Sequence, residues 1–181
     1  LDMGAAVNAE AELKMADMFD ICHGGGLDLC ALGLAEIDAM GNVNVSKFHG
    51  RVTGPGGFID LAQHTKKLIL MGTFTAGGLR EHCEGGRLVI DREGKYQKFK
   101  TDIEQVTFSG DYAAAHGQHV LVVTERAVFR LTPQGLMLTE IAPGVDLERD
   151  ILSQMEFRPL IADDLQLMDG RIFQPNPMGL S

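Results

Sequence analysis

Two glycine clusters are the parts of this sequence whose composition points most directly to chemistry. Three consecutive glycines, Gly24–Gly26, follow His23, and a second cluster, Gly54–Gly57, contains a single proline. Glycine allows the backbone to approach a ligand closely, and exposed backbone N–H groups can hold an anion or a developing oxyanion. Both clusters are candidate ligand-binding loops, although a hinge before a strand and a plain turn before a helix would give the same patterns.

The residues after the second cluster strengthen its case. Phe58–His64 has the pattern of a helix start, and Lys67–Met71 has that of a short buried strand. The loop would then lie at a helix N-terminus, where free N–H groups and the helix dipole favour negative charge. A nucleotide P-loop and a dinucleotide fingerprint are excluded, because no Lys-Ser/Thr pair follows and no Gly-x-Gly-x-x-Gly follows a strand.

A third glycine-bearing loop, Gly72–Gly78, directly follows the Lys67–Met71 strand. Ligands of open α/β sheets bind beyond the carboxyl ends of the strands. We therefore expect the loops at 54–57 and 72–78 to face one crevice. Lys47 and Arg51 precede the 54–57 loop, where they could meet a phosphate or could be solvated surface charges.

Other chemistries find less support in the sequence. The pairs Cys22-His23 and His82-Cys83 lack the spaced ligands of a zinc site, so no metal is expected. No Gly-x-Ser-x-Gly elbow is present, which argues against a serine hydrolase of that type. The spacing of the glutamates singles out no nucleophile, and Glu125 beside Arg126 indicates a charged turn or an ion pair.

The elements that must position these loops change in character along the chain. In the first half, a short helix or irregular segment is expected over Ala9–Phe19, a buried strand over Leu27–Asp38 and an extended segment over Val43–Ser46. The second half is rich in expected strands, over Arg87–Asp91, Tyr96–Phe108, His119–Thr124, Ala127–Leu131 and Gly135–Ile141.

The C-terminal part of the chain has its own signals. Asp146 is a fair N-cap for a helix that ends at Met155, and the tail from Met168 is expected at the surface or as a packing arm. No linker divides the chain, so one domain is expected over residues 1–181. With 181 residues, of which 45% are hydrophobic, the chain is long enough to bury a core.

Charge and cysteine content narrow the class of protein. A net charge of −9 argues against nucleic acid as a partner, because that affinity rests on Lys and Arg. Three cysteines cannot all pair within the chain, which favours a reducing, cytoplasmic setting. No apolar stretch is long enough for a membrane span. Leu1–Gly4 lacks the features of a signal peptide, and the missing initial Met indicates a fragment or a processed product.

Several motifs, taken together and in order, resemble the C-terminal lobe of family I CoA-transferases, above all the long single-chain acetate or acetoacetate type. They cover nearly the whole chain and are Gly24–Leu29, Leu32–Ala35, Gly41–Phe48, Gly54–Ile59, Gly72–Gly78, Thr124–Phe129 and Glu140–Gly144. The resemblance implies an α/β fold of the NagB/RpiA/CoA-transferase kind, with an open mixed sheet, helices and a strand-rich second half. Residues 1–181 would form one such lobe, truncated at its N-terminus.

The resemblance also implies a mechanism. In the family a glutamate attacks the acyl-CoA carbonyl, the resulting mixed anhydride yields a glutamyl-CoA thioester, and a second carboxylic acid takes up the CoA. Gly57 matches the position whose backbone N–H helps to hold the oxyanion, an interaction worth about 3–4 kcal/mol of barrier. CoA is a substrate here and not a resident cofactor. The residues expected to contact it are Gly24, Gly25, Gly26, Asn44, Gly54, Gly56, Thr75 and Gly77.

The sequence departs from the family pattern at two places. The catalytic glutamate lies in a Glu-x-Gly-x-x-Gly segment upstream of the stretch that matches Leu1–Gly4, so it is absent from this chain. The lysine that related members carry in the loop matching Thr73–Gly78 is also missing. The glutamate is therefore expected on an N-terminal lobe that this chain needs as a partner.

The reading that these observations favour is a lobe of a homo-oligomeric acyl-CoA:carboxylate CoA-transferase, inactive alone. Its substrates would be an acyl-CoA, such as acetyl-CoA or acetoacetyl-CoA, and a small carboxylic acid. The main alternative is a non-catalytic module that binds CoA or assembles subunits. A sugar-phosphate isomerase of the same broad fold has less support, because no acid/base pair beside a phosphate loop is recognisable.

Overall fold

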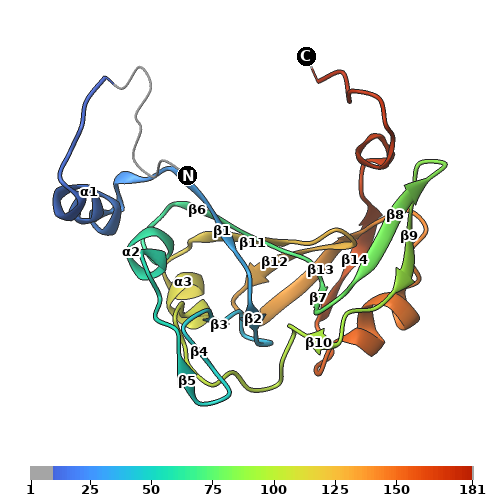
Figure 1. Cartoon of the computed structure of the whole chain (residues 1–181), viewed down its shortest axis with the longest axis horizontal. Coiled ribbons are helices and arrows are strands. Elements are labelled where there is room, and N and C mark those ends of the chain that lie inside the picture. Colours follow the sequence, from blue (N-terminus) through green and yellow to red (C-terminus); the bar gives the residue numbers. More distant parts are fainter. Residues whose placement is uncertain (1–9, 181) are drawn as a thin grey trace.

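A computed structural model describes residues 10–180, which form a six-stranded sheet, short helices and several two-stranded pairs (Figure 1). Leu1–Gly4 and Ala9, on which parts of the sequence expectations fall, lie outside the described residues. Helix α1, Met15–Ile21, buries no residue and continues into a π-helical turn, η1, Cys22–Gly26. The helix expected near the N-terminus therefore exists, but it begins at Met15 and not at the start of the predicted segment.

The central sheet has the strand order β1-β6-β11-β12-β13-β14. The first three strands of this order are parallel, β12 and β13 continue with antiparallel pairing, and β14 is parallel to β13. This arrangement confirms the expected open mixed α/β sheet. The strands are β1 Leu29–Gly33, β6 Lys67–Met71, β11 His119–Val123, β12 Ala127–Thr132, β13 Gly135–Ile141 and β14 Leu160–Leu167.

One face of the sheet forms the main core. Helices α2, Phe58–Ala62, and α3, Gly110–Ala115, lie on this face (Figure 1). Alternate residues of each strand point to one side, so one set of apolar side chains enters the core. Phe99 lies at its centre, with ring centroids 4.5 Å from Phe74 and 5.0 Å from Phe129.

The opposite face of the first three strands is much less covered. Leu29, Met71 and Leu121 are 57%, 47% and 38% exposed, respectively. Figure 1 shows α2 and α3 on the other side of the sheet. Parallel strands are normally buried on both faces, so this face is unusual for a finished parallel sheet.

Short two-stranded pairs lie around the ends of the sheet. Each pair is antiparallel. They are β2 Glu36–Ile37 with β3 Val43–Asn44, β4 Lys47–Phe48 with β5 Arg51–Val52, β7 Thr75–Ala76 with β10 Tyr96–Gln97, and β8 Arg80–Glu84 with β9 Arg87–Arg92.

The structure corrects two of the expected strands. The long strand predicted over Tyr96–Phe108 is wrong, since only β10 is regular there. The chain then passes beneath the sheet, bound by isolated bridges of Phe99 to Ile37 and of Phe108 to Val43. The strand predicted over Leu27–Asp38 divides into β1 and β2. On β1, exposed residues alternate with half-buried ones, because one side of the strand lies on the uncovered face.

The C-terminal part follows its sequence signals. Asp146 accepts a hydrogen bond from the Arg149 N–H at 2.7 Å and begins the helical turns η2, Leu147–Ile151, and η3, Leu152–Gln154. After β14, the tail forms a 3₁₀ turn, η4, Gly170–Phe173.

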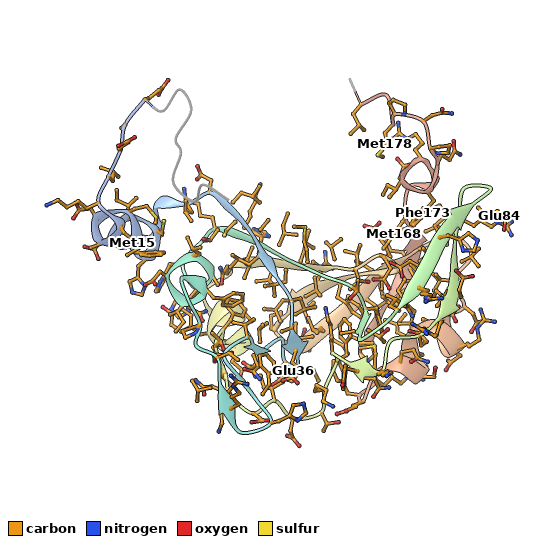
Figure 2. All side chains as sticks on the ribbon, viewed as in Figure 1. Met15, Glu36, Glu84, Met168, Phe173 and Met178 are labelled. Carbon is orange, nitrogen blue, oxygen red and sulfur yellow. The ribbon has the colours of Figure 1, made fainter. Side chains whose placement is uncertain are left out.

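The expected packing arm is confirmed at the start of this tail. Met168 and Phe173, labelled in Figure 2, pack in a small apolar cluster with Leu88 and Ala142. This cluster attaches the C-terminal segment to the turn end of the β8–β9 hairpin. Within residues 10–180, no helix has the length and apolar character needed to cross a membrane.

Candidate functional site

The carboxyl ends of β1, β6 and β11 lie side by side and lead into the loops that the sequence singled out. Leu34 N–H donates to the Met71 carbonyl at 2.7 Å, and Gly72 N–H donates to the Val123 carbonyl at 3.2 Å. The loops after all three strands therefore leave from one edge of the sheet. This is the edge at which open α/β proteins bind ligands, as expected for the 72–78 loop.

A buried arginine holds this edge together. The Arg126 side chain is fully buried, donates from Nε to Glu125 Oε1 at 2.6 Å and pairs through Nη1 with Glu93. Nη1 also reaches the Asp150 carbonyl at 3.1 Å, and the guanidinium lies 5.1 Å from the centre of the Phe74 ring. The ion pair expected between Glu125 and Arg126 is thus confirmed.

The charges of this cluster affect each other. Burial alone would lower the pKa of Arg126, but the contacts with Glu93 and Glu125 outweigh it and raise that pKa. Burial also raises the pKa of Glu81, with the negative charge of Glu125 adding to the effect. The arginine therefore stays charged, and its carboxylate partners depend on it.

The 72–78 loop is fixed to this cluster. Phe74 N–H donates to Glu125 Oε2 at 2.8 Å, and the Thr75 hydroxyl donates to Glu93 Oε2 at 2.9 Å while accepting from the Gly94 N–H at 2.9 Å. The buried Thr75 hydroxyl is therefore occupied by protein partners. Thr75 therefore helps to hold the loop, and its expected contact with CoA stays a prediction.

Gly77 has a conformational reason to be glycine. Its φ is +80°, and a Cβ built on it would lie 2.6 Å from Cδ2 of Tyr96. The aromatic ring therefore lies directly against the loop backbone, as close approach requires. On the side of Gly77 where a Cβ would point, the Tyr96 ring therefore occupies the space that a ligand would need.

A cavity of about 780 Å³ opens beyond the ends of β1 and β6. This volume is in the range of small-molecule and cofactor sites. Its walls come from Leu34–Glu36, from Phe48 and His49 of the β4–β5 hairpin, and from the segment 94–100. The cavity reaches the 72–78 loop at Ala76 but does not include the 54–57 loop, so the expected shared crevice is not formed by this cavity.

Three lysines of the 94–100 segment line the cavity, namely Lys95, Lys98 and Lys100. Lys100 pairs with Glu156, whereas Lys98 Nζ donates to the Leu34 carbonyl at 3.0 Å. Burial lowers the pKa of Lys98, partly offset by the more distant charge of Glu125. The cavity therefore combines apolar walls with positive charge, which suits an anionic ligand.

Sequence reasoning missed these lysines. The clustering of these lysines in the sequence could have revealed them, because three of the 16 Lys and Arg residues fall within six positions of an otherwise acidic chain. The strand predicted over Tyr96–Phe108 includes Lys98 and Lys100 but gives neither a functional role. Only the fold shows that this segment closes a cavity at the end of β1.

The β4–β5 hairpin forms another wall of the cavity. The N–H groups of His49 and Gly50 both donate to the carboxylate of Glu104, which lowers the pKa of that carboxyl. Lys47 is half-buried and Arg51 is exposed, and neither lines the cavity. A phosphate contact by these two residues therefore remains a prediction.

Asn44 is fully buried, and all the bonding capacity of its amide is used. Its Nδ2 donates to Glu36 Oε2 at 2.8 Å and to the Lys47 carbonyl at 2.6 Å, and its Oδ1 accepts from the N–H groups of Ser46 and Lys47, each at 3.1 Å. A direct contact with CoA would break one of these bonds. Asn44 therefore holds Glu36 and the hairpin together, and its expected contact with CoA stays a prediction.

The 54–57 loop leads from β5 into α2, as the sequence predicted, with Gly57 at the N-cap. Gly54 and Gly56 adopt positive φ angles of 83° and 56°, and the Phe58 N–H closes the turn on the Pro55 carbonyl at 3.1 Å. The Gly57 N–H donates to no other described residue. It is thus available as a donor, and its role at an oxyanion stays a prediction.

Packing restricts the space beside this donor. A Cβ built on Gly57 would lie 2.7 Å from Cε1 of Phe19, whose ring comes from α1. Every residue type can adopt the φ of −83° found at Gly57, so backbone strain does not require glycine there. The contact with the Phe19 ring is what leaves no room for a side chain. Helix α1 therefore shields one side of the 54–57 loop.

The first glycine cluster lies elsewhere. Gly24–Gly26 end the turn η1 ahead of β1, at the amino end of the parallel strands, where Gly25 has a φ of 83°. Gly25 lies near the His64 carbonyl after α2, and the His23 and His64 rings meet edge to face at 4.8 Å. Gly25 thus lies at the C-terminal end of α2 and Gly57 at its N-terminal end, and contacts of Gly24, Gly25 and Gly26 with CoA stay a prediction.

Histidines and cysteines do not gather into a metal site in the part of the chain that the structure describes. The cysteines Cys22, Cys30 and Cys83 are all unpaired there, and they are buried, half-buried and exposed, respectively. Their chemistry is therefore that of separate thiols.

Curated proteins similar to this chain are CoA-transferases. The chain is 51% identical over 176 residues to acetate CoA-transferase YdiF of Escherichia coli K12, covering 97% of this chain and 33% of that protein. It is 47% identical over 188 residues to caffeate CoA-transferase of Acetobacterium woodii, covering 99% of this chain and 35% of that protein. The chain thus spans about a third of the length of these relatives. No family model matches it.

A separate subunit and a solved structure agree with these matches. The beta subunit of acetate CoA-transferase from Escherichia coli K12 is 31% identical over 161 residues, which cover 88% of this chain and 64% of that subunit. The apoenzyme structure of acyl-CoA transferase YdiF from Escherichia coli O157:H7 superposes with a TM-score of 0.94 at 49% identity, covering all of this chain and 35% of that one. The chain therefore belongs to the family I CoA-transferases and corresponds to the C-terminal lobe of their single-chain members.

Proposed function

We propose that this chain is the lobe of an acyl-CoA:carboxylate CoA-transferase that forms the acyl-CoA site and the oxyanion hole. The observation that carries the proposal is the match of 51% identity along 97% of the chain to an acetate CoA-transferase. The match covers a third of that protein, so the activity of the whole protein comes to this chain only as a proposal. The open edge beyond β1, β6 and β11 supports it, because a ligand of this fold binds there.

In the proposed reaction, a glutamate outside residues 1–181 attacks the thioester carbonyl of acyl-CoA. The carbonyl oxygen becomes an oxyanion, CoA leaves as a thiolate, and an acyl-glutamyl anhydride remains. The thiolate then attacks the glutamyl carbonyl, releases the first acid and leaves a glutamyl-CoA thioester, from which a second acid collects CoA by the reverse steps. A related structure, of YdiF from Escherichia coli O157:H7, was solved as a thioester complex with CoA.

The Gly57 N–H is the donor that we assign to the oxyanion. It lies at the N-cap of α2 and has no acceptor among the described residues. One preorganised donor of this kind typically contributes about 3–4 kcal/mol to lowering the barrier. Gly54 and Gly56 shape the turn that presents this group, and a direct contact of CoA with their backbone is part of the proposal.

The proposed substrates are a short-chain acyl-CoA, such as acetyl-CoA or acetoacetyl-CoA, and a small carboxylic acid. CoA would be a substrate and not a resident cofactor. The names of the relatives include both acetate and caffeate at similar identity, so the acid is set by pocket side chains that differ within the family. Three unpaired cysteines support a reducing, cytoplasmic setting.

The uncovered sheet face supports a partner lobe. Leu29, Met71 and Leu121 expose apolar surface on parallel strands, which normally pack on both sides. We propose that this face packs against the lobe that carries the catalytic glutamate, supplied by a longer polypeptide or by a second subunit. Oligomers of the assembled enzyme are part of the same proposal.

The test uses Gly57→Ala in the longer polypeptide that contains this lobe, with Gly170→Ala as the matched control. A methyl group at Gly170 meets nothing within 4 Å, whereas at Gly57 it must displace Phe19 or the loop. Formation of the glutamyl-CoA thioester from acyl-CoA, followed by mass spectrometry, should slow roughly a hundredfold in Gly57→Ala, because small misplacements of a donor have effects of that size. Equal rates in Gly57→Ala, Gly170→Ala and the parent protein would contradict the assignment.

A further inference from the structure

Lys98 is a partly buried positive charge that lacks a carboxylate partner. Its Nζ makes one hydrogen bond, to the Leu34 carbonyl at 3.0 Å, and no ion pair within 4 Å to any residue from 10 to 180. An ammonium removed from water without a counter-ion is unfavourable. Such a charge is retained where a ligand of opposite charge replaces the lost water.

The acidic groups around the same cavity are already engaged. Glu36 accepts a hydrogen bond from the Asn44 amide at 2.8 Å, and Glu156 pairs with Lys100 and accepts from the Thr101 N–H at 3.1 Å. Lys100 therefore neutralises Glu156, whereas Glu36 keeps its charge but forms no ion pair within 4 Å with Lys98. Figure 2 shows Glu36 below the sheet, on the side opposite the uncovered face, so the cavity and the proposed partner-lobe surface are separate.

The position of Lys98 in the fold is one where a ligand is expected. Lys98 Nζ lies beside the end of β1, and a Cβ built on Gly72 at the end of β6 would lie 3.0 Å from it. The lysine therefore points to the carboxyl ends of two neighbouring parallel strands, where this class of fold binds ligands. Phe48 and Tyr96 add aromatic walls to the same cavity.

We propose that Lys98 anchors an oxyanion of the transferase substrates in this cavity, either a phosphate of CoA or the carboxylate of the acid. The inference rests on the proposed function, since it takes the ligands from that reaction. Lys95 lies at the rim of the cavity and adds positive charge without being the anchor.

The test is binding of defined anions to the 181-residue chain by titration calorimetry at low salt. The probes are CoA, inorganic phosphate and acetate, with uncharged pantetheine as a reference. Lys98→Met should lower the affinity for at least one anion tenfold or more, and pantetheine should not respond. Lys67→Met removes an exposed charge from the amino end of β6 and should leave all affinities unchanged.

The probes separate the two sources of the oxyanion. If Lys98→Met loses affinity only for CoA and inorganic phosphate, the site binds a phosphate of CoA. If it loses affinity only for acetate, the site binds the carboxylate of the acid. Unchanged affinity of Lys98→Met for every anion would overturn the inference, as would the absence of anion binding to the parent chain at millimolar concentrations.

Folding controls keep the test decisive. The melting temperature of Lys98→Met without ligand should equal or exceed that of the parent, because a poorly solvated ammonium is removed. A lower melting temperature with unchanged affinity would identify a purely structural lysine. Lys98→Arg should retain anion affinity within about threefold, since a cation remains, and an affinity as low as that of Lys98→Met would overturn the role of charge.

Failure of this inference can be distinguished from failure of the proposed function. CoA transfer by the longer polypeptide is measured separately from anion binding by the chain. If the longer polypeptide transfers CoA and the Lys98→Met chain binds anions as tightly as the parent chain, only the role of Lys98 is overturned. Lysine-dependent anion binding in a longer polypeptide that transfers no CoA overturns the proposed function and supports the anion site.

Discussion

Replacing Arg126 with methionine should destabilise the chain more than any other single change of charge that we consider. The guanidinium is fully buried and joins four elements of the structure, through Glu125, Glu93, the Asp150 carbonyl and the Phe74 ring. Methionine fills a similar volume but leaves two carboxylates close together without a counter-ion. The 72–78 loop, which these carboxylates bind, would lose its attachment as well.

The size of the effect follows from the burial of the two carboxylate partners. Glu125 and Glu93 are 16% and 27% exposed, so neither charge would regain full hydration. Breaking a buried pair in this way costs about 3–5 kcal/mol. A kilocalorie lowers the melting temperature by about 2–4 °C for a chain of this length, so Arg126→Met should melt roughly 6–20 °C lower.

Thermal unfolding followed by circular dichroism measures this loss, with Arg158→Met as the control. Arg158 pairs with Glu148 at 3.5 Å, and both side chains are more than 60% exposed, so the control should change stability by less than about 1 kcal/mol. A loss no larger than that of Arg158→Met would refute the reasoning.

Two further predictions concern acid and thiol chemistry. Hydrogen bonds from Arg149 hold the pKa of Asp150 below its ordinary value, so its contribution to stability is present above about pH 4 and is lost as pH falls through the lowered pKa. Asp150→Asn should therefore be less stable at pH 7 and show a flatter decline in melting temperature towards pH 3; parallel curves would contradict this. Cys83 is exposed, whereas Cys22 is buried and burial raises the pKa of the Cys30 thiol. Iodoacetamide followed by peptide mapping should modify Cys83 first, and earlier modification of Cys22 or Cys30 in the folded chain would be inconsistent with these environments.

The sequence predicted those parts of the fold in which the local pattern and the burial agree. The strand over Lys67–Met71 was placed to the residue, because a short apolar run lay between clear turns. Asp146 was identified as an N-cap from its residue type alone, and its side chain caps as expected. Such elements are specified by neighbouring residues and need no knowledge of distant contacts.

The elements that were missed depend on distant partners. Strand β8, Arg80–Glu84, is exposed at every residue and gave no apolar pattern, since it pairs with β9 in a two-stranded hairpin outside the central sheet. The segment after Gln97 has strand-like composition, but isolated contacts with Ile37 and Val43 hold it beneath the sheet. Tertiary contacts decide the structure in both cases.

For the candidate site, too, the sequence predicted what local residues specify and missed what depends on distant contacts. The 54–57 loop was located at a helix start, yet no pattern indicated that the Phe19 ring would cover one side of Gly57. Asn44 and Thr75 were predicted to contact CoA, but their polar atoms are used within the protein. Lys98 gave no signal of its own, because its significance depends on the cavity that the fold creates.

The central claim is that this chain carries half of a CoA-transferase site and that the nucleophile lies on another lobe. The most direct test compares acyl-CoA transfer, from acetoacetyl-CoA to acetate, by residues 1–181 alone and by the same residues joined to the polypeptide encoded upstream. The account predicts no turnover by the chain alone, and turnover with a CoA thioester on an upstream glutamate in the longer protein. Turnover of acetoacetyl-CoA and acetate by the 181-residue chain would contradict it.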